Sequence, residues 1–130
     1  MGTIKRFEDL DTWKKARILT RQVFDLTSKE SFRGDWSLRD QLRRASVSTM
    51  ANIAEGFERG GDREFLQFLS IAKGSVGELK SHLYVAQDAG LVTEDQFREL
   101  YALSVDTGEL IGGFMKYLRQ SDMKGQKYRS

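Results

Sequence analysis

Apolar residues recur at helical spacing in separate stretches of the chain. The stripe in the first stretch is Ala16, Leu19, Val23 and Leu26. This i, i+3, i+4 spacing is typical of an amphipathic helix, and no stretch shows the sustained alternation of a half-buried strand. The pattern predicts helices over about residues 10–27, 37–57, 63–89 and 94–121.

Residues with capping chemistry stand at the ends of these stretches. The predicted N-terminal caps are Asp9 or Asp11, Ser37 with Asp40, Asp62, and the capping box from Thr93 to Gln96. Gly90 can end the third helix in a left-handed conformation. Because the connections are short, neighbouring helices must run antiparallel. The sequence therefore predicts an all-α fold, an antiparallel up-down-up-down four-helix bundle over residues 1–121, followed by a basic mobile tail at 122–130.

The second predicted helix is apolar on two faces. One face contains Leu42, Ala45 and Ile53, and the other contains Val47, Met50, Ala54 and Phe57. A helix of this kind must bury both faces, so it should lie centrally or contact another subunit.

The second and third helices should form a hairpin around the Gly60-Gly61 turn. This hairpin places Ala45, Ser46 and Ser48 opposite Gly74, Ser75 and Gly77. Glycine inside a helix costs about 1 kcal/mol relative to alanine, so Gly74 and Gly77 favour a close approach of the two backbones.

Polar residues of the same hairpin are candidates for fixing its register. Arg43 and Arg44 fall level with Glu78, so an ion pair there is expected. Asn52 and Glu55 lie within an apolar helix, where a buried polar pair can specify one assembly at some cost in stability.

Composition indicates one soluble domain. The chain has 130 residues, no Cys and no Pro. The absence of Cys excludes disulfides and thiolate metal sites and fits a reducing compartment. Neither a membrane span nor a secretory signal is recognisable, so we expect a cytoplasmic protein with no membrane partner.

The chain offers little catalytic chemistry. His82 is the single histidine and stands four residues after Glu78, whereas di-iron bundles use Glu-x-x-His pairs on two helices. The arginine preceding His82, Arg63, is too distant for the Arg-to-His spacing of bundle ribonucleases. Gly60-Gly61 and Gly112-Gly113 lack the Lys-Ser/Thr of a phosphate-binding loop. We therefore expect no catalytic residues, no metal, no cofactor and no small-molecule substrate.

Basic residues leave nucleic-acid binding open as an alternative. The candidate contacts are Lys14, Lys15, Arg17, Arg21, Arg43, Arg44, Lys124, Lys127 and Arg129. The net charge of +2 is a weak electrostatic footprint for one chain, although an oligomer would multiply it. The aromatic content does not by itself predict base stacking.

Three ordered motifs resemble the four-helix-bundle family also called the 23S rRNA-intervening sequence proteins. The matching positions are Phe7, Leu10, Trp13, Ala16, Gln41 to Ala45, Asn52 to Gly56, Ala72, Gly74, Ser75, Glu78 and Leu79. The chain departs from the family pattern at Met50, where relatives often have proline, and its linker lacks the usual Phe-Pro.

The resemblance implies structure more than chemistry. Relatives are small bundles that assemble into rings, often pentamers. A more distant relative is the basic, pentameric accessory protein of diversity-generating retroelements, which engages nucleic acid. We therefore expect a non-enzymatic homo-oligomer, ring-like and pentameric, that serves as a scaffold or adaptor. The alternative is an RNA- or DNA-binding accessory protein that acts through a basic face of the oligomer.

Overall fold

The computed structural model describes the backbone of residues 4–129 and the side chains of residues 4–121. The four α-helices are α1 (Asp11–Thr27), α2 (Trp36–Glu58), α3 (Asp62–Asp88) and α4 (Glu94–Arg129). Two single-turn 3-10 helices, η1 (Phe7–Asp9) and η2 (Glu30–Phe32), precede α1 and α2. The described residues include no strand, and none of their helices is long and apolar enough to cross a bilayer.

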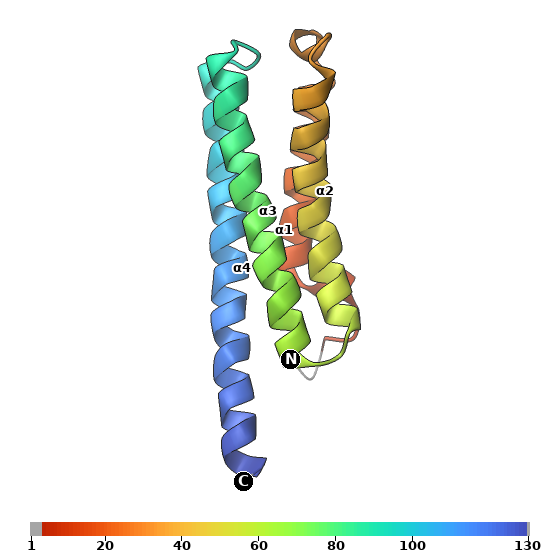
Figure 1. Cartoon of the computed structure of the whole chain (residues 1–130), viewed down its shortest axis with the longest axis vertical. Helices are drawn as coiled ribbons and strands as arrows, with labels where there is room; N and C mark the ends of the chain where they lie inside the picture. Colours follow the sequence, from red (N-terminus) through yellow and green to blue (C-terminus); the bar gives the residue numbers. More distant parts are fainter. Residues whose placement is uncertain (1–3, 130) are drawn as a thin grey trace.

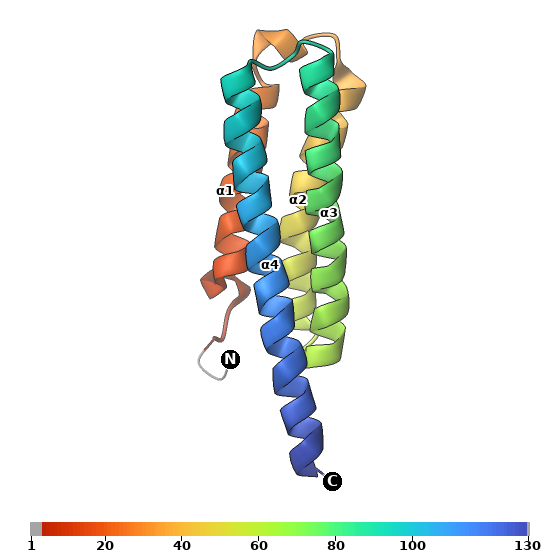
Figure 2. The same ribbon diagram turned by 90° about the vertical axis from the view of Figure 1, so that its left-hand side faces the viewer.

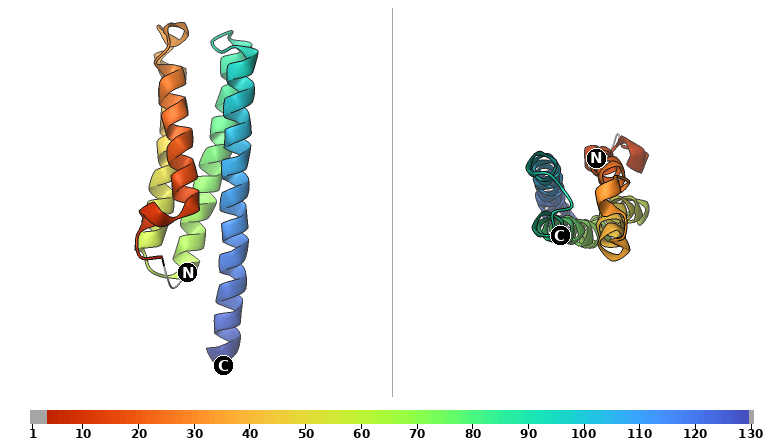
Figure 3. Two further views of the ribbon diagram at one scale, coloured as in Figure 1. Left: turned by 180° about the vertical axis from the view of Figure 1, so that it is seen from behind. Right: turned by 90° about the horizontal axis from the view of Figure 1, so that it is seen from above.

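The helices form the predicted bundle. Along the colour gradient of Figure 1, the chain runs up, down, up and down a single long axis. Each helix packs against the next in sequence, and α1 also contacts α4, which closes the bundle. Figures 2 and 3 show α1 and α4 side by side on the face opposite the α2–α3 seam.

The core confirms the apolar stripes. Buried side chains from all four helices form one cluster around Ile53, Leu69 and Ile111 and another around Leu19 and Leu83. Burying a side chain of this size contributes roughly 1.5–3 kcal/mol relative to leaving it exposed. Burial of the stripes is therefore what holds the four helices together.

α2 and α3 approach each other closely at Gly56. A Cβ atom at this position would lie 2.7 Å from Phe68 Cβ and 2.8 Å from Phe65 Cδ1. Within the chain, by contrast, a Cβ at Gly74 or Gly77 would have nothing within 4 Å. The prediction of close backbone contact at Gly74 and Gly77 is therefore wrong, because both glycines lie off the core-facing stripe of α3.

Three of the predicted helix caps are also wrong. The N-cap residues of α1, α2 and α3 are Leu10, Asp35 and Gly61, and none makes a side-chain cap bond. The helices begin one or two residues away from the expected positions. Asp62 therefore falls inside the first turn, where its charge still favours the positive end of the helix dipole.

The two predicted boundaries between α3 and α4 are correct. Gly90 has a φ of 73°, and its N–H donates to the Gln87 carbonyl at 3.0 Å. The N–H of Thr93 donates to Gln96 Oε1 at 2.9 Å, while the N–H of Gln96 donates to Thr93 Oγ1 at 3.1 Å.

The last helix is longer than predicted. α4 continues from the expected end near Ser121 to Arg129 and projects past the ends of the other helices (Figure 1). Residues 122–129 contain no proline and a single glycine, Gly125, so little in the sequence stops the helix. The expected mobility of this tail stays a prediction.

Replacing Gly56 by alanine should destabilise the bundle by about 1–3 kcal/mol, because the added methyl overpacks the contact with Phe65 and Phe68. The melting temperature measured by circular dichroism should fall accordingly. The matched control is Gly77→Ala, which has open space around its methyl and gains up to about 1 kcal/mol of helix propensity. Equal melting temperatures for the two variants would contradict the close contact at Gly56.

Candidate interaction surfaces

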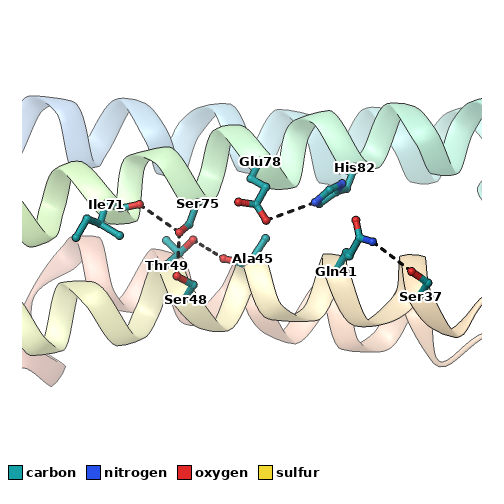
Figure 4. Close-up of polar contacts among 9 residues, drawn as sticks. All are labelled: Ser37, Gln41, Ala45, Ser48, Thr49, Ile71, Ser75, Glu78 and His82. Carbon is teal, nitrogen blue, oxygen red and sulfur yellow. Dashed lines mark hydrogen bonds and ion pairs between the residues drawn. The ribbon is translucent and has the colours of Figure 1, made fainter.

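Polar side chains line the seam between α2 and α3 (Figure 4). The hydroxyl oxygens of Ser48 and Ser75 lie 2.9 Å apart and share a hydrogen bond. The Asn52 amide donates to the Ser48 carbonyl at 2.8 Å and to Ser48 Oγ at 3.1 Å. The Ser48–Ser75 hydrogen bond confirms the predicted register of α2 against α3, and the two hydroxyl groups link these helices.

Arg43 contacts α1 rather than Glu78. Its Nε donates to Thr27 Oγ1 at 2.8 Å, and its Nη2 donates to Ser28 Oγ at 3.1 Å. These bonds bring its positive charge to the C-terminal end of α1, where a cation is favoured. The predicted ion pair with Glu78 is wrong for Arg43, because residues level along the axis can point to different neighbours around it.

The other predicted register residues act within their own helices. Glu78 lies 3.5 Å from Nε2 of His82, and exposed Glu55 pairs with Arg59 at 2.8 Å. The predicted buried pair of Asn52 and Glu55 is therefore wrong, since Glu55 lies on the solvent side of α2. Arg44 is exposed and makes no ion pair with Glu78 among the described side chains.

Exposed apolar and small residues gather where α2 and α3 meet on the outside. We call this surface, formed by Val47, Ala51, Ile71 and Gly74, the α2–α3 outer face. Val47 is 46% exposed and Ile71 is 52% exposed. The second apolar face predicted for α2 is thus only partly present, because Met50 and Phe57 pack against the core of the same chain.

The candidate nucleic-acid residues whose side chains the structure describes do not form one patch. Lys14, Arg17 and Arg21 are exposed together on α1, while half-buried Lys15 lies on the stripe of α1 that faces α4. Arg44 lies on the α3 side of α2. The side chains of Lys124, Lys127 and Arg129 lie outside the described ones.

A set of arginine–aromatic pairs covers the junction of α1 and α2. The guanidinium carbons lie 5.7, 4.4 and 3.9 Å from the ring centroids in the pairs Arg17–Trp13, Arg43–Phe24 and Arg39–Trp36. Thr20, on the stripe that carries Trp13 and Phe24, donates to the Ser46 carbonyl of α2 at 3.1 Å. These pairs therefore lie along one surface, which we call the α1–α2 face.

The upper end of this face borders a basic pocket of about 220 Å³. Its lining includes Lys29, Arg33, Trp36 and Arg39. The Nε atom of Arg39 is buried and has no hydrogen-bond partner among the described residues. Lys29, Arg33 and Arg39 outnumber the one carboxylate of the lining, Glu30, so the charge of the pocket favours an anion. The sequence alone does not reveal this pocket, because the fold brings together residues of α1, η2 and α2.

An aromatic cluster occupies the upper α3–α4 junction. The rings of Tyr84 and Tyr101 lie 5.4 Å apart, and Phe97 stacks on Tyr101 at 5.3 Å. The hydrogen bond with Tyr101 raises the pKa of the Tyr84 phenol above its ordinary value. Tyr84 therefore stays protonated at neutral pH and is a poor candidate for a base.

The described side chains do not assemble a metal centre. They include no group of three His, Cys, Asp or Glu residues placed to hold a metal ion. The side chain of His82 is 20% exposed, and its Nε2 lies 3.5 Å from Glu78 Oε1. The two groups form an ion pair only when the imidazole is protonated.

Comparison with known proteins agrees with this architecture. A family model described as 23S rRNA-intervening sequence protein matches residues 8–113. A crystal structure of a protein of unknown function from the S23 ribosomal protein family of Bacteroides thetaiotaomicron superposes with a TM-score of 0.75. It is 18% identical and covers 81% of this chain and 98% of its own, which establishes likeness of fold. No functionally curated protein matches significantly. Because the family model matches most of its length and its fold has four helices, the chain belongs to the 23S rRNA-intervening sequence protein family.

Proposed function

We propose that the chain is a non-enzymatic, homo-oligomeric scaffold whose copies meet through the α2–α3 outer face. The observation that carries this proposal is Gly74. Glycine inside a helix costs about 1 kcal/mol, and within one chain nothing approaches Gly74 closely enough to require it. A helix from a second copy could use that open space.

The neighbours of Gly74 suit such a contact. Ile71, one turn before it on α3, and Val47 on α2 expose apolar surface, and Ala51 adds a small side chain. Burial removes about 25 cal/mol of free energy per Å² of apolar surface covered. Small residues between larger apolar ones also let two helices pack at short distance.

A ring follows if this face meets a different face of the next copy. Heterologous contacts of this kind close into rings when the rotation permits. The resemblance to ring-forming relatives makes five the expected number of subunits. We place the assembly in the cytoplasm, in keeping with a chain that has no cysteine.

A second function, binding of single-stranded nucleic acid, is favoured by the α1–α2 face. Aromatic rings stack on bases of any sequence, and the paired guanidinium groups add charge for phosphates. Trp36 is 59% exposed and lines the basic pocket together with Lys29, Arg33 and Arg39. Such binding is compatible with a scaffold, because the α1–α2 face is separate from the α2–α3 outer face.

Light scattering coupled to gel filtration should show an oligomer at micromolar concentration. Val47→Glu should lower the mass toward that of one 14.9 kDa chain by placing charge in the contact. The matched control is Ile18→Glu, since Ile18 is also 46% exposed but lies on the α4 side of α1. A monomeric wild-type protein would refute the scaffold, and equal loss in both variants would refute the assigned face.

Tryptophan fluorescence tests the second function, because Trp13 and Trp36 are the two tryptophans of the chain and both lie on the α1–α2 face. In Trp13→Phe the signal comes from Trp36 alone. Single-stranded RNA should quench it, and rising salt should weaken binding steeply through counterion release. Arg39→Gln should lower the affinity by about tenfold.

Arg98→Gln serves as the control for that experiment, since Arg98 lies on α4 and pairs with Asp95 at 2.8 Å. Its affinity should match that of the parent protein. A duplex of the same sequence should bind more weakly than the single strand, because paired bases cannot stack on the rings. Equal binding of the duplex, or of a polyglutamate chain, would argue against a nucleic-acid site.

A further inference from the structure

The basic pocket at the upper end of the α1–α2 face lies where the chain crosses from α1 to α2 (Figure 1). Its lining comes from the end of α1, from η2 and from the first turn of α2. Its volume of about 220 Å³ is below the roughly 300 Å³ at which sites for whole small molecules begin. A pocket of this size therefore suits one small charged group, such as a phosphate, with the rest of the ligand outside.

The pocket concentrates positive charge that the rest of the face distributes evenly. Further down the face each aromatic ring has one guanidinium group, with Arg17 over Trp13 and Arg43 over Phe24. The pocket lining instead carries three cations and one carboxylate, which leaves a formal charge of +2. A phosphate diester within a strand carries one negative charge, whereas a terminal phosphate monoester carries about −1.5 to −2 at pH 7. The single arginines therefore suit internal phosphates, and the pocket suits a terminal one.

The cations of the lining are available to a ligand. Among the described residues, Arg33 is the one lining cation that forms an ion pair, at 3.1 Å from Glu30, and the two side chains are 81% and 84% exposed. An ion pair this exposed is weak, so a phosphate can replace the carboxylate. Arg43 donates to Thr27 Oγ1 and Ser28 Oγ, which both belong to the lining, and thereby adds a fourth cation beside the pocket.

Trp36 supplies a surface for the base that adjoins a bound phosphate. Its side chain lines the pocket and is nevertheless 59% exposed. The guanidinium carbon of Arg39 lies 3.9 Å from the centroid of its ring, which holds the ring and the charge together. A base can stack on the exposed part of the ring while its phosphate enters the pocket. The two halves of a terminal nucleotide are thus matched at one place.

We propose that the basic pocket binds the terminal phosphate of a single strand whose following nucleotides lie along the α1–α2 face. Lys29, Arg33 and Arg39 bind the phosphate monoester, and the terminal base stacks on Trp36. This inference rests on the nucleic-acid binding proposed above and adds that the protein recognises the end of a strand. An internal segment of a strand binds along the face without the contacts in the pocket.

Isothermal titration of the full-length protein compares three strands of one short RNA sequence, with a 5′-phosphate, with a 3′-phosphate, or with hydroxyl groups at both ends. At low salt, at least one phosphorylated strand should bind about tenfold more tightly than the hydroxyl strand, because the pocket attracts the added charge. A hydroxyl strand that is two nucleotides longer carries similar added charge in diesters and should gain much less. An equal gain from the longer strand would overturn the proposal.

The same titrations separate this inference from the function on which it rests. Equal affinity for the phosphorylated and hydroxyl strands would overturn recognition of the strand end and leave single-strand binding in place. Absence of binding by every strand would refute both. A phosphoserine peptide should bind far more weakly than the phosphorylated RNA, because it offers no base to Trp36. Comparable binding of the peptide would assign the pocket to a phosphorylated protein and overturn the proposal.

Two variants locate the phosphate. Arg33→Gln and Lys29→Gln change exposed side chains, so circular dichroism should show native helix content. Each should reduce the gain from the terminal phosphate to about twofold and leave the affinity of the hydroxyl strand unchanged. The matched control is Arg17→Gln, because Arg17 lies over Trp13 at the other end of the face and should weaken both strands by the same factor. A full gain in Arg33→Gln, or its loss in Arg17→Gln, would overturn the assignment to the pocket.

Discussion

α2 and α3 pack tightly because residue 56 has no side chain. With Gly56 under Phe65 and Phe68, the two backbones approach, and the Phe65 ring reaches Phe114 of α4 at 5.2 Å. The Ser48–Ser75 bond further along the seam uses the same alignment. The absence of a side chain at residue 56 thus supports the packing of the α2–α3 hairpin against α4.

The sequence predicts the helices and their buried stripes well because burial imposes a period that many residues share. Single-residue features are harder to predict, since a shift of one or two positions at a helix start removes Asp62 and Ser37 from their predicted caps. The predicted Arg43–Glu78 ion pair is wrong for a different reason. Two residues at the same height along the bundle axis can point in different directions around their helices. The buried position of Gly56 can be predicted from the sequence, because Gly56 continues the core stripe of Thr49 and Ile53. Gly74, by contrast, lies off the corresponding stripe of α3.

Most of the candidate surfaces could not be predicted from the sequence, because each combines residues of different helices. Arg43 lies over Phe24 of another helix, and a pocket between α1 and α4 is lined by both Thr12 and Glu109. The bundle distributes distinct chemistry over its faces, with apolar residues on the α2–α3 outer face, arginines and rings on the α1–α2 face, and carboxylates between α1 and α4. A fold with such separate faces can contact several partners at once, which suits the adaptor role proposed above.

The neighbour-to-neighbour packing also has a kinetic consequence. Every main helix contact except that between α1 and α4 joins elements adjacent in the chain, and such local topologies fold quickly. The chain contains no proline, so slow isomerisation of X-Pro bonds cannot delay it. A newly made copy should therefore reach its native form within milliseconds, and any slower, concentration-dependent phase in refolding would report the meeting of separate molecules.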